Sequence, residues 1–455
     1  MPRTYWVETL GCPKNQVDSD KLTGTMAADG LVPAASVEDA DLVVVNTCAF
    51  IEEAREESVA TILALEEHKA EGAELVVTGC MAERYGDQLA AALPEVDAVA
   101  GFGVPVTLGR RVDRTAPVGA TEWPARIGAA TSVPTLDLLN LPRPRSERPW
   151  AYVKVAEGCD KACGFCAIPT FRGPQRSRTL DSVLEEVRAL QVREVVLVAQ
   201  DLAAYGRDRT GDGRIDAPSG TTPIAELVRA VADEVDRVRL LYLYPSELTD
   251  ELVELIATGP VPYFDLSLQH VSAPLVRRMR RWGDGERFLA RIESVRSLRP
   301  DAAFRSNFIV GYPGETEEDH DRLLDFVDAA QLDWCGFFSY SDEEGTYASG
   351  LGDLVDAALV DDRLAELREL QDAITAARRD ALVGERTVVL VDEPGVARSH
   401  REAPEIDGIV EVPDDMEVGA LHLVEVVAAA GPDLTAVPVA TPGVDDGTAA
   451  EVVAS

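Results

Sequence analysis

Three cysteines close together in the chain, Cys159, Cys163 and Cys166, are the residues whose types and spacing point most directly to chemistry. They form a C-x3-C-x2-C run in the stretch EGCDKACGFCAIP. Three thiolates in one loop can hold three irons of a 4Fe-4S cubane and leave the fourth iron open to chelate a substrate. A structural zinc ion needs four ligands, and no fourth Cys or His lies nearby in the sequence. The run therefore favours an iron–sulfur cluster over zinc.

Three further cysteines, Cys12, Cys48 and Cys80, stand at the ends of predicted β-strands. The strands that precede them are predicted over residues 4–11, 41–47 and 74–79. In an open parallel sheet the carboxyl ends of the strands share one edge, where ligands bind. We therefore expect these thiols to converge and hold a second cluster. The alternative is that each is a small buried hydrophobic residue, the common fate of a free cysteine.

The elements that must position these cysteines follow an α/β pattern. The first hundred residues alternate strand and helix, which predicts a parallel sheet. A second series opens with the strand AYVKVAEG just before the cysteine run, and its successive βα units predict a partial or complete barrel. Its other elements are predicted as a helix over 180–190 and strands over 194–200, 238–244, 263–268 and 304–310.

The last quarter of the chain changes character. An amphipathic helix is predicted over 361–382, and Gly384 follows it as a stop signal. Short Val-rich runs come after it, namely TVVLVDE, GIVEVP and LHLVEVV, separated by Gly, Pro and Asp. These runs predict a small β-barrel with an acidic tail.

Composition excludes several classes of protein. A chain of 455 residues with 46% hydrophobic residues is globular, and no apolar run approaches the roughly 20 residues that span a bilayer. The N-terminus has no signal-peptide core, and seven cysteines are too sparse for a disulfide framework, so we expect a cytoplasmic protein with no membrane partner. The formal charge of −37 repels phosphate backbones and favours a basic protein partner.

The cysteine run at the start of a βα series resembles the radical S-adenosylmethionine superfamily. The resemblance implies that the open iron binds S-adenosyl-L-methionine and that reductive cleavage yields a 5′-deoxyadenosyl radical. With the contexts TLGCPKNQVDSD, VNTCAF and VTGCMAERY, nearly the whole chain resembles the methylthiotransferase family. That family implies two 4Fe-4S clusters, the N-terminal one carrying the sulfur to be delivered. It also implies a low-potential electron donor such as flavodoxin or ferredoxin.

The same resemblance implies a division of the chain into an N-terminal iron–sulfur domain, a linker, a radical domain and a TRAM β-barrel with an acidic tail. We place these segments at 1–115, 116–148, 149–380 and 381–455, respectively.

Six residues near the predicted barrel mouth are expected to contact the cofactor. Phe165, inside the cysteine loop, resembles an aromatic residue that lies near the adenine. The polar residues at predicted strand ends are Gln200, Asp201, Ser267, Gln269 and Asn307. For each of these the alternative is an ordinary loop hydrogen bond. Many relatives have Thr-Asp where this chain has Ser306 and Asn307, so a role carried over to Asn307 stays open.

Two arginine groups interrupt the acidic sequence, and the interpretation of both stays open. They are Arg172, Arg176 and Arg178 after the cysteine loop, and Arg277, Arg278, Arg280 and Arg281 further on. Each group is either a solvated surface or a contact for anions such as a cofactor carboxylate or an acidic substrate side chain. Cys335, the seventh cysteine, is expected in the core, as is typical of a free cysteine.

The family divides into enzymes that modify a tRNA adenosine and a branch that modifies an aspartate of small-subunit ribosomal protein twelve. Residues 381–455 hold three arginines and fifteen acidic residues, a net charge of −12. Such a barrel would repel RNA and attract a basic ribosomal protein. RSHREAPEIDG also resembles the protein-modifying branch, and we expect its Glu402, Glu405 and Asp407 to be surface charges that draw the substrate. The tRNA enzyme is the alternative, and a non-enzymatic metal scaffold a remote one.

Overall fold

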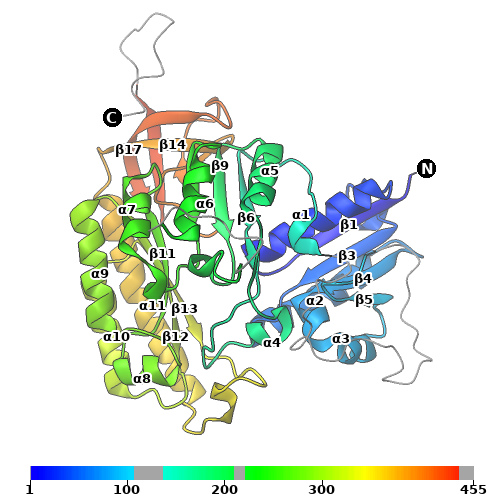
Figure 1. Ribbon diagram of the computed structural model, residues 1–455, viewed down its shortest axis with the longest axis horizontal. Coiled ribbons are helices and arrows are strands. Elements are labelled where there is room, and N and C mark those ends of the chain that lie inside the picture. The colour runs from blue at the N-terminus through cyan, green and yellow to red at the C-terminus, as the bar shows by residue number, and fades with distance from the viewer. Residues whose placement is uncertain (1, 107–136, 210–220, 440–455) are drawn as a thin grey trace, which may run out of the picture.

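The computed structural model describes residues 2–106, 137–209 and 221–439. Most of the predicted linker and the whole acidic tail beyond residue 439 lie outside these ranges. Figure 1 shows three units: an N-terminal sheet in blue, a central barrel in green to yellow, and a C-terminal barrel in orange and red. The N-terminal unit lies beside the central barrel, and the C-terminal barrel covers one end of it (Figure 1).

The N-terminal unit is a five-stranded parallel sheet with the strand order β2-β1-β3-β4-β5. Its strands are β1 (Thr4–Thr9), β2 (Val32–Pro33), β3 (Leu42–Thr47), β4 (Glu74–Gly79) and β5 (Ala98–Ala100). Its helices are α1 (Pro13–Ala28), α2 (Glu52–His68) and α3 (Cys80–Ala92). Along β3, Val43 and Val45 pack in one core cluster and Leu42 and Val44 in another, so both faces of the sheet are buried.

The central unit is a partial barrel of parallel strands. One sheet holds β6 (Trp150–Lys154), β9 (Glu194–Val198) and β10 (Arg237–Leu240), and the other holds β11 (Tyr263–Gln269), β12 (Ala303–Val310) and β13 (Trp334–Ser339). A parallel bridge between Leu243 and Leu266 joins the two sheets. The larger helices of this unit are α5 (Leu180–Leu190), α6 (Pro223–Ala232), α7 (Asp250–Thr258), α9 (Gly285–Leu298) and α10 (Glu317–Ala330).

The short elements of the central unit surround the cysteine loop and the barrel mouth. They are β7 (Ala156–Glu157), β8 (Arg176–Ser177), α4 (Ile168–Arg172) and α8 (Ala273–Arg278). The strand predicted over 238–244 ends early, at Leu240, because Tyr242 has a left-handed backbone with φ of 65° and turns the chain. Strand β13, which contains Cys335, was not predicted.

Helix α11 (Ala357–Asp380) leads into a closed barrel with the order β14-β15-β16-β18-β17. The barrel strands are β14 (Arg386–Glu393), β15 (Val396–Arg398), β16 (Val410–Glu411), β17 (Leu421–Ala430) and β18 (Asp433–Pro438). The predicted fold class is therefore confirmed in all three parts: a parallel α/β sheet, a partial βα barrel and a small C-terminal β-barrel. Within the described residues, no helix has both the length and the apolar character to cross a membrane.

Residues 399–408, between β15 and β16, close the floor of the central barrel. Backbone carbonyls of this segment accept hydrogen bonds from side chains on the central strands: Tyr152 Oη donates to Pro404 at 2.7 Å and Trp334 Nε1 to Arg401 at 2.7 Å. Ala403 is fully buried in the same core cluster as Tyr152. We call residues 399–408 the floor segment.

The expectation that Glu402, Glu405 and Asp407 are all surface charges is wrong. Glu402 is fully buried and pairs with Arg379 of α11. Asp407 pairs with Arg305 at 3.3 Å and accepts a hydrogen bond from Tyr263 Oη at 2.6 Å. Glu405 alone of the three is exposed. The carboxylates point inward because the floor segment is docked against the barrel.

Replacing Glu402 with Gln should destabilise the protein, because it leaves Arg379 buried without its carboxylate. Breaking a buried ion pair from one side costs about 3 to 5 kcal/mol. The matched control is Glu405→Gln, which breaks a half-exposed pair with Arg148 and should cost less than about 1 kcal/mol. Thermal unfolding followed by circular dichroism measures both. Equal shifts in the two variants would show that the floor segment does not hold the units together.

Candidate functional site: two cysteine triads

The C-x3-C-x2-C run lies between β7 and α4, in the loop that follows the first barrel strand. Backbone hydrogen bonds hold this loop at several points. Cys159 N donates to Gly173 O at 3.1 Å, and Gly164 N donates to Met279 O at 2.8 Å. Arg281 Nη1 donates to Cys163 Sγ at 3.2 Å. These contacts constrain the positions of the loop residues. We call residues 158–167 the radical loop, after the superfamily that the sequence resembles.

Glycines with positive φ precede Cys12 and Cys159, and both are needed for close approach. Gly158 has φ of 78°, and a Cβ there would lie 2.2 Å from Pro174 O. Gly11 has φ of 92°, and a Cβ there would lie 3.0 Å from Cys48 Sγ. A side chain at Gly158 would displace the radical loop, and one at Gly11 would push Cys48 away from its neighbours.

The N-terminal thiols lie at the carboxyl edge of the first sheet, where the strand ends were predicted to place them. Cys12 follows β1, Cys48 follows β3 and Cys80 begins α3 directly after β4. Asn15, which is fully buried, ties the three strand ends together. Its Nδ2 donates to Leu10 O at 2.9 Å and to Thr47 O at 3.1 Å, and its Oδ1 lies 3.6 Å from Cys80 Sγ.

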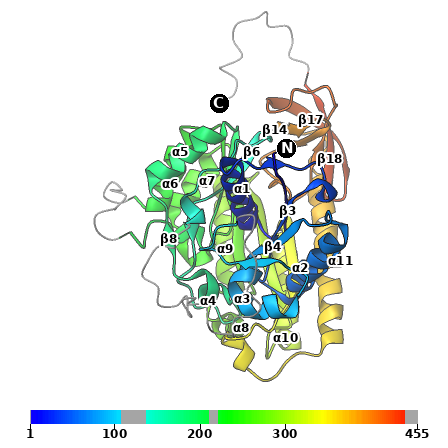
Figure 2. The same cartoon turned by 90° about the vertical axis from the view of Figure 1, so that its right-hand side faces the viewer.

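Arg172 connects the two triads. It is the last residue of α4, which follows the radical loop, and Figures 1 and 2 both place α4 beside α3. Its Nη2 donates to Cys80 Sγ at 3.0 Å and to Asn15 Oδ1 at 2.9 Å, and its Nη1 donates to Glu157 at 2.8 Å. Glu157 in turn accepts from Gln200 Nε2 at 2.8 Å, at the mouth of the barrel.

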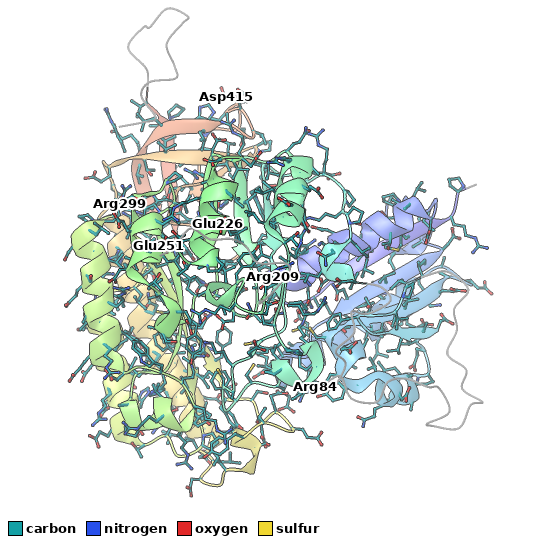
Figure 3. All side chains as sticks on the ribbon, in the orientation of Figure 1. Arg84, Arg209, Glu226, Glu251, Arg299 and Asp415 are labelled. Atoms are coloured by element: carbon teal, nitrogen blue, oxygen red, sulfur yellow. The ribbon has the colours of Figure 1, made fainter. Side chains whose placement is uncertain are left out.

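A second contact between the units lies further out. Arg84 of α3, labelled in Figure 3, pairs with Glu343 in the loop after β13. Arg55 of α2 donates to the same carboxylate at 2.8 Å. Glu343 is almost fully buried, and these guanidinium groups offset its burial so that its pKa lies below the usual value. The N-terminal unit is thus anchored to the segments that follow both outer strands of the central barrel, β6 and β13.

Burial raises the pKa of most of the thiols. The pKa of Cys159 is raised to about 11, and those of Cys166 and Cys48 to about 12. The neighbouring thiols Cys80 and Cys12 act after burial to raise the pKa of Cys48 further. A metal cluster would compensate the charge of these thiolates, and binding it would release their protons.

The pKa of Cys12 is shifted in the opposite direction to those of Cys48, Cys159 and Cys166. Burial acts to raise its pKa, but Lys14 and Arg172 together lower it below the usual thiol value. The N-terminal triad therefore has two cations beside it, one from its own helix and one from the radical unit.

The donor set fits iron–sulfur clusters. All six cysteines are free thiols in two groups of three. In the described part of the chain, no three His, Cys, Asp or Glu side chains converge closely enough to hold a single metal ion. Thiolates are the ligands of iron–sulfur clusters, and three of them in each group would leave one iron of a cubane open.

Among the residues predicted to bind the cofactor, Asn307 lies in the middle of β12 and not at a strand end as predicted. Three of the predicted residues carry buried oxygens without a hydrogen-bond partner in the described structure. These atoms are Gln200 Oε1, Asp201 Oδ1 and Asn307 Oδ1. They come from the ends of β9 and from β12. Unpaired buried acceptors suit a ligand rich in N–H and O–H donors, such as the amino and ribose groups of S-adenosylmethionine.

The other three predicted residues lie nearby with different surroundings. Phe165 packs against a core cluster that includes Met279 and Tyr312. Ser267 uses its main chain: its N donates to Leu243 O at 2.9 Å and its carbonyl accepts from Arg281. Gln269 has φ of 71° at a register shift in β11.

Two tyrosines after β10 lie near the two triads, one beside each. Lys14 Nζ lies 3.5 Å from the centroid of the Tyr242 ring. Burial raises the pKa of the Tyr242 hydroxyl, and the nearby Cys12 thiol raises it further. Tyr244 lies under Arg281, at 4.2 Å from the ring centroid, and Cys163 acts on it in the same way. Residues two apart are at most about 7 Å apart at Cα, so the two cysteine sites are neighbours.

Sequence reasoning missed several of these residues. Asn15, Lys14 and Tyr242 were not singled out, although Asn15 and Lys14 belong to the quoted stretch TLGCPKNQVDSD. Arg172 was considered as an anion contact, whereas the structure places it in ion pairs with Glu157 and on Cys80. A polar residue three positions after a strand-end cysteine is the signal that could have indicated Asn15.

Family comparisons agree with this geometry. Residues 153–327 match the Radical SAM superfamily, and residues 383–439 match the TRAM domain. Residues 4–101 match a family described as "Uncharacterized protein family UPF0004". The superfamily match includes the cysteine loop and the barrel strands from the end of β6 to β12, and it ends before β13. The chain is therefore a radical S-adenosylmethionine enzyme, which uses that cofactor and an iron–sulfur cluster.

Individual relatives define the family more closely. The ribosomal protein uS12 methylthiotransferase RimO of Moorella thermoacetica is 42% identical, over 90% of this chain and 93% of that protein. Those of Saccharopolyspora erythraea and Cutibacterium acnes are each 41% identical, with 95% and 96% of this chain and 94% and 98% of those proteins covered. This chain belongs to the RimO family of methylthiotransferases.

Replacing Gly158 with Ala should empty the radical loop of iron, because the added Cβ meets the backbone at Pro174 and Gly173. The strain of a left-handed non-glycine residue, about 1 to 2 kcal/mol, adds to the clash. Gly72→Ala is the control: it has φ of 87° but no atom within 4 Å of the new Cβ. Iron analysis and 5′-deoxyadenosine formation measure the effect. Wild-type iron in the Gly158→Ala variant would contradict the assigned loop geometry.

Proposed function

We propose that this chain transfers a methylthio group to an unactivated carbon of an aspartate in ribosomal protein uS12, by radical S-adenosylmethionine chemistry with two 4Fe-4S clusters. The observation that carries the proposal is that Arg172 contacts Cys80 of one thiol triad and Glu157, two residues before Cys159 of the other. One site for radical generation and one for sulfur delivery is what carbon–sulfur bond formation needs. The printed function of the RimO relatives supports the choice of uS12.

We propose that Cys159, Cys163 and Cys166 ligate the catalytic cluster. A reduced cluster held by these thiols would supply the electron that cleaves S-adenosylmethionine, and the resulting 5′-deoxyadenosyl radical would take a hydrogen atom from the substrate carbon. The barrel wall excludes water from that radical. Cys12, Cys48 and Cys80 ligate the second cluster, which carries the sulfur. Arg172 fixes Cys80 and neutralises part of the thiolate charge next to the barrel mouth.

The cofactor contacts are proposed from the barrel mouth. Gln200, Asp201 and Asn307 offer their unpartnered oxygens to the donors of S-adenosylmethionine. Phe165, Ser267 and Gln269 complete the pocket through packing and main-chain shape. Lys161 pairs with Asp201 at 3.5 Å and holds that carboxylate in place.

The remaining assignments follow the domain organisation. We propose an N-terminal iron–sulfur domain over 1–115, a linker over 116–148, a radical domain over 149–380, and a TRAM barrel with an acidic tail over 381–455. A low-potential donor such as flavodoxin or ferredoxin supplies electrons, and the protein acts in the cytoplasm.

The exposed surface of the C-terminal barrel supports a basic protein substrate over tRNA. Asp414, Asp415 and Glu417 are exposed on the turn after β16, and Figure 3 labels Asp415 at the far end of the molecule. Of the barrel arginines, Arg398 is buried in pairs with Glu194 and Asp392, so it cannot bind RNA. The described surface of the C-terminal barrel is therefore acidic even without Glu402 and Asp407, which form ion pairs inside the molecule.

The two triads should separate two measurable steps. Cys159→Ala, Cys163→Ala and Cys166→Ala together should lower iron from about eight to about four per chain and abolish 5′-deoxyadenosine formation. Replacing Cys12, Cys48 and Cys80 with Ala should also halve the iron but keep cofactor cleavage, while methylthio transfer is lost because sulfur has no carrier. Reconstituted enzyme is assayed with uS12 and with bulk tRNA, and mass spectrometry detects an added methylthio group.

Cys335→Ala is the control, because that thiol lies on β13 and belongs to neither triad. Full activity of the N-terminal triple variant would show that the first triad is structural. Modification of tRNA in place of uS12 by the wild-type enzyme would overturn the proposed substrate.

Neutralising Asp414, Asp415 and Glu417 to their amides should slow association with uS12 and flatten its salt dependence, because exposed charges act mainly on the association rate. The Debye length falls from about 10 Å at 0.1 M salt to about 3 Å at 1 M, so the difference should vanish at high salt. Stopped-flow binding measures this. The control changes Asp321, Asp325 and Asp328 on the exposed side of α10. Equal slowing in both variants would refute a role for the barrel surface.

A further inference from the structure

The substrate's own charge poses a problem that the site must solve; this inference rests on the proposed function. An aspartate presented to both triads brings a carboxylate that is ionised near neutral pH into a space lined by barrel strands. A buried carboxylate without a cation is strongly disfavoured. Some cation facing that space must therefore be available to pair with it.

Most cations around this space already have carboxylate partners. Lys161 pairs with Glu247 at 2.8 Å, Arg172 with Glu157 at 2.8 Å and Arg305 with Asp407 at 3.3 Å. Lys154 pairs with Glu157 at 2.7 Å and with Asp18. Recruiting any of them would strip a buried carboxylate of its partner.

Arg281 has no carboxylate partner in the described residues, but its donors are occupied. Its Nη1 donates to Cys163 Sγ at 3.2 Å and its Nη2 donates to the Ser267 carbonyl. It stacks on Tyr244 beside the radical loop. This position belongs to the catalytic cluster and its cofactor.

Lys14 differs from all of these cations. It lies in the first turn of α1, two residues after Cys12, and is partly exposed. Its ammonium lies 3.5 Å from the centroid of the Tyr242 ring. Within the described ranges no carboxylate pairs with it. A cation held on a ring face at a partly exposed position is bound less strongly than one in a charge-assisted hydrogen bond, so a carboxylate can capture it.

Lys14 is also in a suitable position to pair with the carboxylate of a substrate aspartate. The N-terminal triad is on one side of it, through Cys12, and the barrel interior is on the other, through Tyr242. The groups that face Tyr242 from the barrel floor, Asp265 and Arg305, pair with each other at 3.6 Å. Lys14 is thus a cation without a carboxylate partner in the described residues, placed between the sulfur-carrying site and the radical site.

We propose that Lys14 binds the carboxylate of the substrate aspartate and holds the side chain between the two triads. The ammonium leaves the face of Tyr242 when the carboxylate arrives. Lys14 is then a specificity-determining residue: it selects an aspartate over its amide, and over any neutral group of similar size.

A double-mutant cycle tests this contact on reconstituted enzyme with S-adenosylmethionine bound. The dissociation constant is measured for uS12 and for uS12 with its target Asp replaced by Asn. Wild-type enzyme should bind the Asp form about tenfold or more tighter than the Asn form, as expected for a desolvated charge pair. Lys14→Met should bind both forms with equal, weak affinity and should lose methylthio transfer.

Two further variants make the result specific. Lys69→Met removes the same charge from the N-terminal unit, where Lys69 pairs with Glu66 at 3.5 Å, and should keep the wild-type preference for Asp. Lys14→Arg keeps the charge and should retain most of that preference. Iron content and the electron paramagnetic resonance spectrum of the reduced clusters are recorded for each variant.

The outcomes separate the two proposals. Persistence of the Asp preference in Lys14→Met, with wild-type enzyme active on uS12, overturns the role of Lys14 alone. Loss of iron and of the preference in both Lys14 variants assigns Lys14 to cluster assembly and also overturns it. A wild-type enzyme that does not methylthiolate uS12 overturns the proposed function, and the role of Lys14 with it.

Discussion

The buried guanidinium of Arg172 is the interaction on which the rest of the site depends. Its donors reach Cys80 and Asn15 in the first unit and Glu157 in the second, so one side chain fixes the orientation of the two triads. A buried charge of this kind is stable only when all its partners are present. Asp18 and Lys154 complete the network, and both lie at the contact between α1 and β6.

The three units are consequently joined by charge pairs as well as by apolar packing. Glu343 forms ion pairs with Arg55 and Arg84 of the N-terminal unit. At the barrel floor, Glu194 forms ion pairs with Arg239 and with Arg398 of the C-terminal barrel. Paired charges at such contacts specify one relative orientation, because a small rotation would leave them unpaired. For a reaction between two separate sites, that fixed distance matters more than stability.

The parts of this arrangement that were predictable from sequence are those set by local rules. Strand ends place Cys12, Cys48 and Cys80 at one sheet edge whatever the details of packing, and the spacing of Cys159 to Cys166 keeps those thiols in one loop. Contacts between distant segments were not predictable. Glu402 and Asp407 looked like surface charges, because nothing in RSHREAPEIDG shows that Arg379 and Arg305 approach it. Strand β13 was not predicted because its sequence, WCGFFS, contains a glycine and its buried positions do not alternate with exposed ones.

Helix α4 carries a consequence for how the protein is made. Ala167 and Phe171, which follow the radical loop, are buried in the same core cluster as Leu10 and Met81 of the first sheet. The first unit therefore lacks part of its interior until the ribosome has synthesised about 170 residues. A chain that ends at the predicted linker would expose that apolar surface. The cysteine-bearing edge of the first sheet therefore depends, for its full packing, on a segment made after the first unit.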